Sequence, residues 1–287
     1  MTTAATIFVL SGTYILLALG WVIIFRATQI MNFATGEFMV LGAYIFYLFL
    51  VIRHLNTVLS AVLALLVAAV FGAGCYALLL RRMVTQPLFS AVVVTLGLST
   101  IASGMIDIIA GPNDITLPSS LANATISLPG GARVSVEGVA TTGVALVVVA
   151  LLMLFYRFSS LGVQMRAAAE SPALAARSGM NVALIFGLSW AIAGVITAIA
   201  GITYGYTNAI SPQASQLGLD GIAPALIGGF VSIGGTVPGA IIIATVQTLG
   251  VTYLGGASSD AVAFAVLLLF IMVRPSGLFG GSRVRSV

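Results

Sequence analysis

An amide, a hydroxyl and a carboxylate stand together at the start of an apolar stretch, in the sequence NFATGEFMVLGAY at 32–44. They belong to Asn32, Thr35 and Glu37. A charged side chain at the centre of a bilayer costs about 2.5–3.5 kcal/mol on insertion scales, so it is expected to face a protein interior or water and to have a partner. Arg26 is one candidate partner. The alternative is that Glu37 lies at headgroup depth, where water solvates its charge.

A second group of polar residues is spaced by four, at Thr95, Ser99, Ser103 and Asp107. Residues four apart lie on one face of a helix, so this spacing predicts a polar row. Such a row suits the wall of a hydrophilic path. Alternatively, the hydroxyls bond to carbonyls four residues back or join neighbouring helices, and Asp107 lies at the membrane interface.

Residue types that enzymes use for catalysis are scarce. The single histidine, His54, lies at the end of a predicted span, and the single cysteine, Cys75, lies inside an apolar run. The sequence has no cluster with metal-ligand spacing and no close pair of acids. An intramembrane enzyme is therefore poorly supported.

The elements that carry these residues are long and apolar. The chain has 287 residues, of which 60% are hydrophobic and 6% are charged, against about 25% charged in soluble domains. About 20 apolar residues cross a bilayer, so we expect an all-α polytopic membrane bundle that forms a single domain over 1–287. The predicted spans are 6–25, 30–52, 57–80, 88–110, 139–156, 182–203, 236–254 and 259–273.

Arginines predict the orientation of this bundle. Positive residues accumulate on the cytoplasmic side, which places Arg81, Arg82 and the loop 157–181 in the cytoplasm and the N-terminus outside. Eight crossings would leave the arginines after residue 273 outside. A ninth, short or broken crossing near 220–238 removes this conflict, because Pro224 and two glycine pairs interrupt any helix there. We therefore expect eight or nine crossings, with a broken or re-entrant element.

The longest polar connection, 111–138, is expected on the extracytoplasmic side. Apolar and polar residues alternate there on both sides of Pro129-Gly130-Gly131, which predicts a small β-hairpin.

Other small or polar residues favour structural roles. Asp220 and Asp260 each precede an apolar helical run, so N-capping is their expected role. A row of small residues, spaced by four and three, predicts a smooth face on which another helix packs closely. The row consists of Gly187, Ala191, Gly194, Ala198 and Gly201.

The loop 157–181 contains the helix-prone sequence RAAAESPALAARSGMNV. Ser171-Pro172 is a signal for the start of a second short helix, and Gly179 is placed to end it. A short amphiphilic helix tethered between two spans could lie on the membrane surface or dock into a groove on another protein.

Three segments carry a resemblance to a known family: NFATGEFMVLGAY, RAAAESPALAARSGMNV with the later AIAGVITAIAG, and ALIGGFVSIGGTVPGA. In this order, and across nearly the entire chain, they resemble the permease subunits of branched-chain amino acid ABC transporters. The resemblance implies a bacterial inner-membrane importer subunit that forms half of the translocation pathway for branched-chain, hydrophobic amino acids. Related permeases carry urea, short amides or aromatic acids, and these motifs do not separate the solutes.

The resemblance also implies two sets of site residues. The loop 157–181 would contain a coupling helix that sits on an ATPase subunit, with contacts from Arg166, Ala167, Glu170, Ala175, Gly179 and Met180. The polar motif belongs to the translocation region of the family. Together with the polar row, the predicted pathway residues are Asn32, Thr35, Gly36, Glu37, Thr95, Ser99 and Ser103.

Other polypeptides would supply the energy. The sequence has no lysine, so it cannot contain the ATP-binding loop G-x-x-x-x-G-K-[ST]. The resemblance implies two ATPase subunits that bind ATP and Mg²⁺, a second permease subunit as heterodimer partner, and a solute-binding protein that docks over 111–138. We expect no cofactor, metal or nucleic acid on this chain itself. The competing class is an ion-coupled secondary transporter or channel with Glu37 and Asp107 as ion or proton sites.

Overall fold

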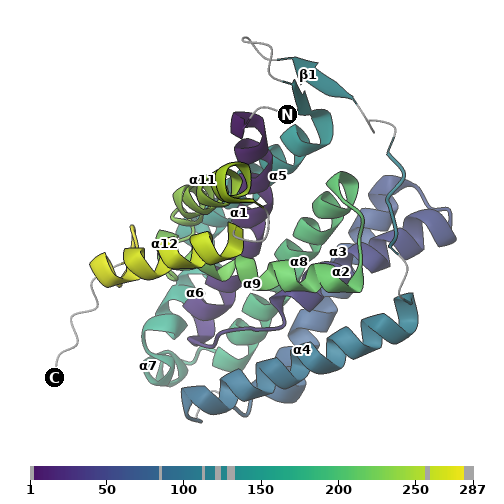
Figure 1. Cartoon of the computed structure of the whole chain (residues 1–287). Coiled ribbons are helices and arrows are strands. Elements are labelled where there is room, and N and C mark those ends of the chain that lie inside the picture. The colour runs from purple at the N-terminus through teal and green to yellow at the C-terminus, as the bar shows by residue number, and fades with distance from the viewer. Residues whose placement is uncertain are drawn as a thin grey trace.

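Long apolar helices make up most of the computed structural model (Figure 1), which describes residues 3–83, 86–111, 114–119, 124–127, 133–255 and 259–280. Within these residues, seven helices are long and apolar enough to cross a membrane. They are α1 (Thr3–Thr28), α2 (Thr35–Tyr47) continued by η1 (Leu48–Ile52), α3 (Thr57–Cys75) continued by η2 (Tyr76–Leu80), α4 (Leu88–Ala110), α5 (Val136–Phe158), α8 (Val182–Thr207) and α11 (Thr236–Leu254). A shorter apolar helix, α12 (Ser259–Val273), follows.

Each of the eight predicted spans contains one of these helices, which confirms the all-helical membrane class. The second span differs most from its prediction. The prediction begins this span at residue 30, whereas the helix begins at Thr35. Gln29 has φ +58°, a left-handed conformation that helices do not continue, so the chain leaves α1 there and reaches α2 through a short non-helical segment.

Helix α1 lies in the core of the bundle. All its residues from Ser11 to Ile24 are buried. It packs against α5, α8 and α11 and against the short helix α10 (Ile222–Gly228). A helix that is apolar on every side belongs inside a larger assembly of helices, and α1 is apolar in this way.

Helix α8 is the second packing centre, because its row of small residues faces two neighbours. Gly187 faces the Tyr76 ring, and Gly194 lies against the Ala68 carbonyl of α3. Ala198 lies against Gly42 of α2, and a Cβ at Gly201 would overlap the Met39 carbonyl. The backbones of α2, α3 and α8 therefore approach closely, as small residues at helix interfaces allow.

Between α8 and α11 the chain forms short helical pieces: η3 (Pro212–Gln216), α9 (Leu217–Asp220) and α10. The helix is interrupted at Gly229, whose φ is +100°, and resumes at Thr236. The expectation that Asp220 caps a helix is wrong. Asp220 ends α9, and α10 begins after Gly221 with no side-chain cap. Asp260 lies in the first turn of α12, and its side chain lies outside the described residues.

The two ends of the bundle differ in character. At one end, β1 (Thr125–Ser127) pairs antiparallel with β2 (Arg133–Ser135), which confirms the predicted hairpin strands, whereas the turn at 128–132 lies outside the described residues. We call this the hairpin end, and the start of α1 lies beside it (Figure 1). Ile115 also pairs with Ile210 there.

The opposite end carries α6 (Ser160–Glu170) and α7 (Pro172–Arg177) (Figure 1). We call it the arginine end. Each of its arginines lies in α6 or α7 or within a few residues of the end of a membrane helix. They are Arg26, Arg81, Arg82, Arg157, Arg166, Arg177 and Arg274.

Candidate translocation and coupling sites

The segment between α1 and α2 folds back on itself inside the protein. Asn32 is 1% exposed, and its side-chain oxygen accepts a hydrogen bond of 3.1 Å from the Ala34 amide. The Thr35 hydroxyl donates to the Asn32 carbonyl at 2.6 Å. These bonds hold a tight turn directly before α2, while the Asn32 side-chain nitrogen is buried and lacks a partner among the described residues.

Glu37 is also buried, with 6% of its surface exposed. Its carboxylate accepts a hydrogen bond of 2.8 Å from the Ser99 hydroxyl of α4. The predicted partner, Arg26, lies elsewhere: its guanidinium packs over the Tyr156 ring, 4.8 Å from the centroid. The partner of the acid is therefore a neutral hydroxyl from another helix.

The polar row on α4 turns from the interior to the surface along its length. Thr95 is buried, and its hydroxyl donates to the carbonyls of Met31 and Val92 at 3.1 and 2.9 Å. Ser103 is half-buried, and Asp107 is exposed at the hairpin end. Thr95 and Ser99 thus hold α4 against the turn before α2 and against its first residues.

Gly36 is placed by close backbone contact with the segment after α8. A Cβ on Gly36 would overlap the Ser215 carbonyl, and Gly218 lies directly against Gly36. The Trp21 indole of α1 donates to the Gly218 carbonyl at 2.8 Å. The short helices η3 and α9 therefore reach the interior of the bundle at the level where α2 begins.

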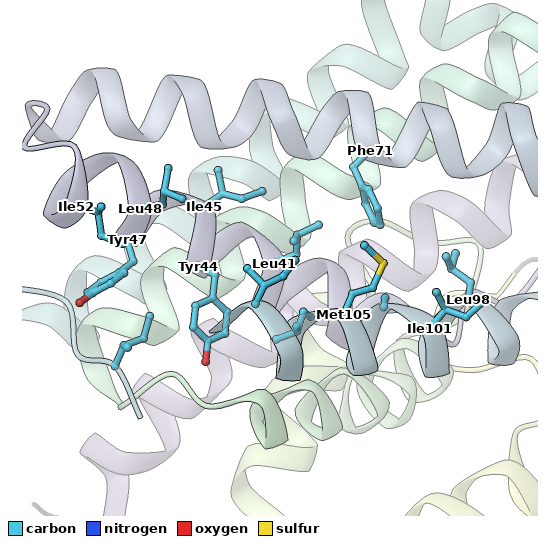
Figure 2. Close-up of a pocket in the computed structure, with 14 residues that line it drawn as sticks. Leu41, Tyr44, Ile45, Tyr47, Leu48, Ile52, Phe71, Leu98, Ile101 and Met105 are labelled. Atoms are coloured by element: carbon cyan, nitrogen blue, oxygen red, sulfur yellow. The ribbon is translucent and has the colours of Figure 1, made fainter. Parts of the chain in front are cut away.

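An apolar cavity of about 420 Å³ lies between α2 and α4 (Figure 2). Leu41, Tyr44 and Ile45 line it from one side, and Ile101 and Met105 from the other. None of the seven predicted pathway residues lines this cavity. Its walls suit acyl chains or aliphatic side chains better than ions or polar solutes.

A second cavity of about 410 Å³, the polar cleft, lies between α1, α9 and α11. No sequence pattern indicates this cleft, because its residues come from three distant segments. Ten residues line it: Thr3, Thr6, Leu10, Tyr14, Leu217, Asp220, Gln247, Thr248, Val251 and Thr252. The Tyr14 hydroxyl donates to the Gln247 side-chain oxygen across the cleft's floor, and both side chains are buried.

The predicted coupling helices form a compact unit at the arginine end. Ser159 caps α6 by accepting from the Gly162 amide at 2.9 Å, and Ser171 caps α7 by accepting from the Leu174 amide at 3.3 Å. Pro172 opens α7, and Gly179 follows it with φ +82°. The start and stop signals predicted from the sequence are confirmed.

The surface of this unit is divided between inward and outward residues. Glu170 and Gly179 are exposed, whereas Arg166 and Ala167 are half-buried and Met180 packs against the core. Ala175 is buried at 4% exposure, so its side chain is not available to a partner. No sequence pattern singled out Leu174, an apolar side chain of α7 that is 62% exposed.

Comparison with known proteins identifies the family. The family model described as "Branched-chain amino acid transport system / permease component" matches residues 3–272. The chain belongs to this permease family. It is a multi-pass membrane protein and the permease component of an ABC transport system, not itself an enzyme. Family membership sets aside the ion-coupled alternative.

Relatives match along nearly the whole chain. The high-affinity branched-chain amino acid transport permease LivH of Salmonella typhimurium is 28% identical over 97% of this chain and 94% of its own. BraD of Pseudomonas aeruginosa is 26% identical over 96% and 94%. Among solved structures, PsaBC from Streptococcus pneumoniae in complex with Fab matches with a TM-score of 0.52 and 14% identity over 97% of this chain and 94% of that one, which shows the fold alone.

Proposed function

We propose that this permease forms half of the translocation pathway of a bacterial inner-membrane importer for branched-chain amino acids. The observation that most supports this proposal is α7, a short capped helix that exposes Leu174 at the arginine end. An exposed apolar side chain on a rigid helix fits a groove on another protein. A chain without lysine needs such a partner, because it cannot hold ATP in a P-loop.

The partners follow from this role. Two ATPase subunits bind ATP and Mg²⁺ and receive α6 and α7. A second permease subunit forms the other half of the pathway. An extracytoplasmic solute-binding protein docks at the hairpin end, over the region 111–138. The family membership and the LivH and BraD relatives support this assembly.

Nine crossings agree best with the arginine positions. Ile210 pairs with Ile115 at the hairpin end, whereas Gly229 lies against Gly280 and Gly234 near Met153 at the arginine end. The segment η3–α9–α10 would then cross the membrane as a broken element buried in protein, which the bilayer tolerates. With α12 as the last crossing, Arg274 reaches the cytoplasm, in agreement with the positive-inside rule.

Copurification and reconstitution test the proposal. A gently solubilised complex should contain a P-loop ATPase, and proteoliposomes with the complete complex should accumulate L-leucine only with ATP. Glu170→Arg should insert normally but bind less ATPase, while Asp107→Arg, an exposed acid at the hairpin end, should bind it normally. Uphill uptake by the purified chain under an ion gradient would overturn the ATP-driven mechanism.

A further inference from the structure

The polar cleft combines one negative charge, several hydroxyls and three aliphatic side chains. Its ten described lining residues include the Asp220 carboxylate and no cationic side chain. Leu10, Leu217 and Val251 form its apolar part. A volume of about 410 Å³ lies within the range of small-molecule sites, about 300–1,000 Å³.

The cleft runs from the hairpin end toward the middle of the bundle. Thr3 and Thr252 are exposed at its mouth, and Tyr14 and Gln247 are buried at its floor. From Thr3 to Tyr14 the helix α1 rises about 16 Å at 1.5 Å per residue. This is roughly half of the 30 Å hydrocarbon core of a bilayer. The floor therefore lies near the membrane midplane, the depth at which secondary transporters bind their substrates.

A buried hydroxyl at this floor is available to a ligand. Thr248 is 7% exposed, and its side-chain oxygen is buried without a hydrogen-bond partner in the described part of the chain. Buried hydroxyls in native proteins are normally paired, so an orphan beside a polar cavity indicates a group that is missing from the site. The neighbouring Thr252 hydroxyl donates to the Thr248 carbonyl at 2.7 Å, and its oxygen can still accept.

We propose that the polar cleft is the site at which this permease binds an aliphatic amino acid. This inference rests on the proposed transport function. The Asp220 carboxylate pairs with the α-ammonium group. The Thr248 hydroxyl donates to the α-carboxylate. Leu10, Leu217 and Val251 contact the aliphatic side chain. The Tyr14–Gln247 pair closes the floor and orients the residues around it.

Cysteine labelling tests whether the cleft is a water-filled ligand site. In a Cys75→Ala background, Thr252→Cys should react rapidly with a charged, membrane-impermeant thiosulfonate added from the hairpin side. Tyr253→Cys is the matched control, because Tyr253 is 79% exposed on the same helix but does not line the cleft. It should react at least about tenfold more slowly, since a thiol in lipid does not ionise. Equal rates would overturn the inference.

Ligand protection tests the charge pairing without ATP turnover. L-leucine should slow the labelling of Thr252→Cys in the full complex, whereas 4-methylpentanoate, which has the same side chain and carboxylate but no ammonium group, should not. Asp220→Asn should weaken the protection by leucine about tenfold, as expected for the loss of one charged hydrogen bond. Equal protection by both compounds, or full protection in Asp220→Asn, would contradict the proposal.

Transport measurements separate this inference from the function on which it rests. Thr248→Val should lower the rate of ATP-driven leucine uptake several-fold with normal ATPase association. Thr245→Val on the same helix should not, because the Thr245 hydroxyl already donates to the Ile241 carbonyl and lies outside the cleft. Normal uptake in Thr248→Val and Asp220→Asn would overturn the cleft assignment alone. Protection by leucine without uptake by the wild-type complex would overturn the importer function but would still support the cleft as a ligand site.

Discussion

The Ser99 hydroxyl donates a 2.8 Å hydrogen bond to the Glu37 carboxylate and joins α4 to the first turn of α2. The two residues are 62 positions apart in the chain. The bond fixes the start of α2 against the middle of α4, at the depth of the buried turn that contains Asn32. Glu37 therefore helps to position α2 against α4, a role that the sequence around Glu37 does not indicate.

Removing this partner should destabilise the fold. Ser99→Ala leaves a buried carboxylate with one hydrogen bond fewer, so we expect the free energy of unfolding to fall by about 1.5–3 kcal/mol. Thermal unfolding of the purified protein in detergent measures this change. Ser103→Ala, four residues along the same helix, should change it by less than about 0.5 kcal/mol. In a double-mutant cycle with Glu37→Gln, additive effects would show that the two side chains do not interact.

Gly36 should tolerate no side chain. Gly36→Ala places a methyl group against the Ser215 carbonyl and should lower the free energy of unfolding by about 1–3 kcal/mol or more. Gly97→Ala is the matched control, because nothing lies within 4 Å of a Cβ there. It should be neutral or stabilise α4 by about 0.4–1 kcal/mol. Equal effects at both positions would argue against the close contact between α2 and the segment after α8.

Leu174 should anchor the ATPase contact. Leu174→Asp puts a charge on the exposed face of α7 and should reduce copurification of the ATPase at least about tenfold, as expected for an anchor residue that the complex buries. Ile126→Asp makes the same exchange on an apolar side chain 44% exposed at the hairpin end, and it should leave ATPase association intact. If Leu174→Asp binds the ATPase normally, α7 is not the contact.

The number of crossings predicts which sites are accessible from each side. In a Cys75→Ala background, Ser127→Cys should be labelled from outside intact cells, and Ser178→Cys only after the membrane is opened. Nine crossings place Ser276→Cys on the same side as Ser178→Cys. Labelling of Ser276→Cys from outside would support an even number of crossings.

Much of the fold was predictable because it depends on local signals. Apolar length located the helices, and Ser171-Pro172 with Gly179 located the ends of α7. The glycine pairs after Pro224 located the helix interruption. The arginines after the third span and those of the loop 157–181 predicted the same side of the membrane. The structure places both groups at the arginine end.

The sites were less predictable because they depend on contacts between distant segments. One sequence contains no information on which helices lie side by side, so it offers Arg26 as a partner for Glu37, whereas Arg26 packs on Tyr156. For the same reason the Tyr14–Gln247 pair, 233 positions apart, gave no signal. The apolar run that follows Asp220 predicts a helix cap, whereas the residues that line the polar cleft with Asp220 include hydroxyls and an amide.

The connection from α7 to α8 is short and hydrogen-bonded at both ends: the Met180 amide donates to the Ala175 carbonyl, and Asn181 caps α8 by accepting from the Leu184 amide. No long flexible loop therefore separates the two helices. We therefore expect a displacement of α7 to move the start of α8, and α8 in turn packs at Gly201 against the Met39 carbonyl, two residues from Glu37. Helix α8 thus connects the short helices at the arginine end to the neighbourhood of the buried Glu37 carboxylate.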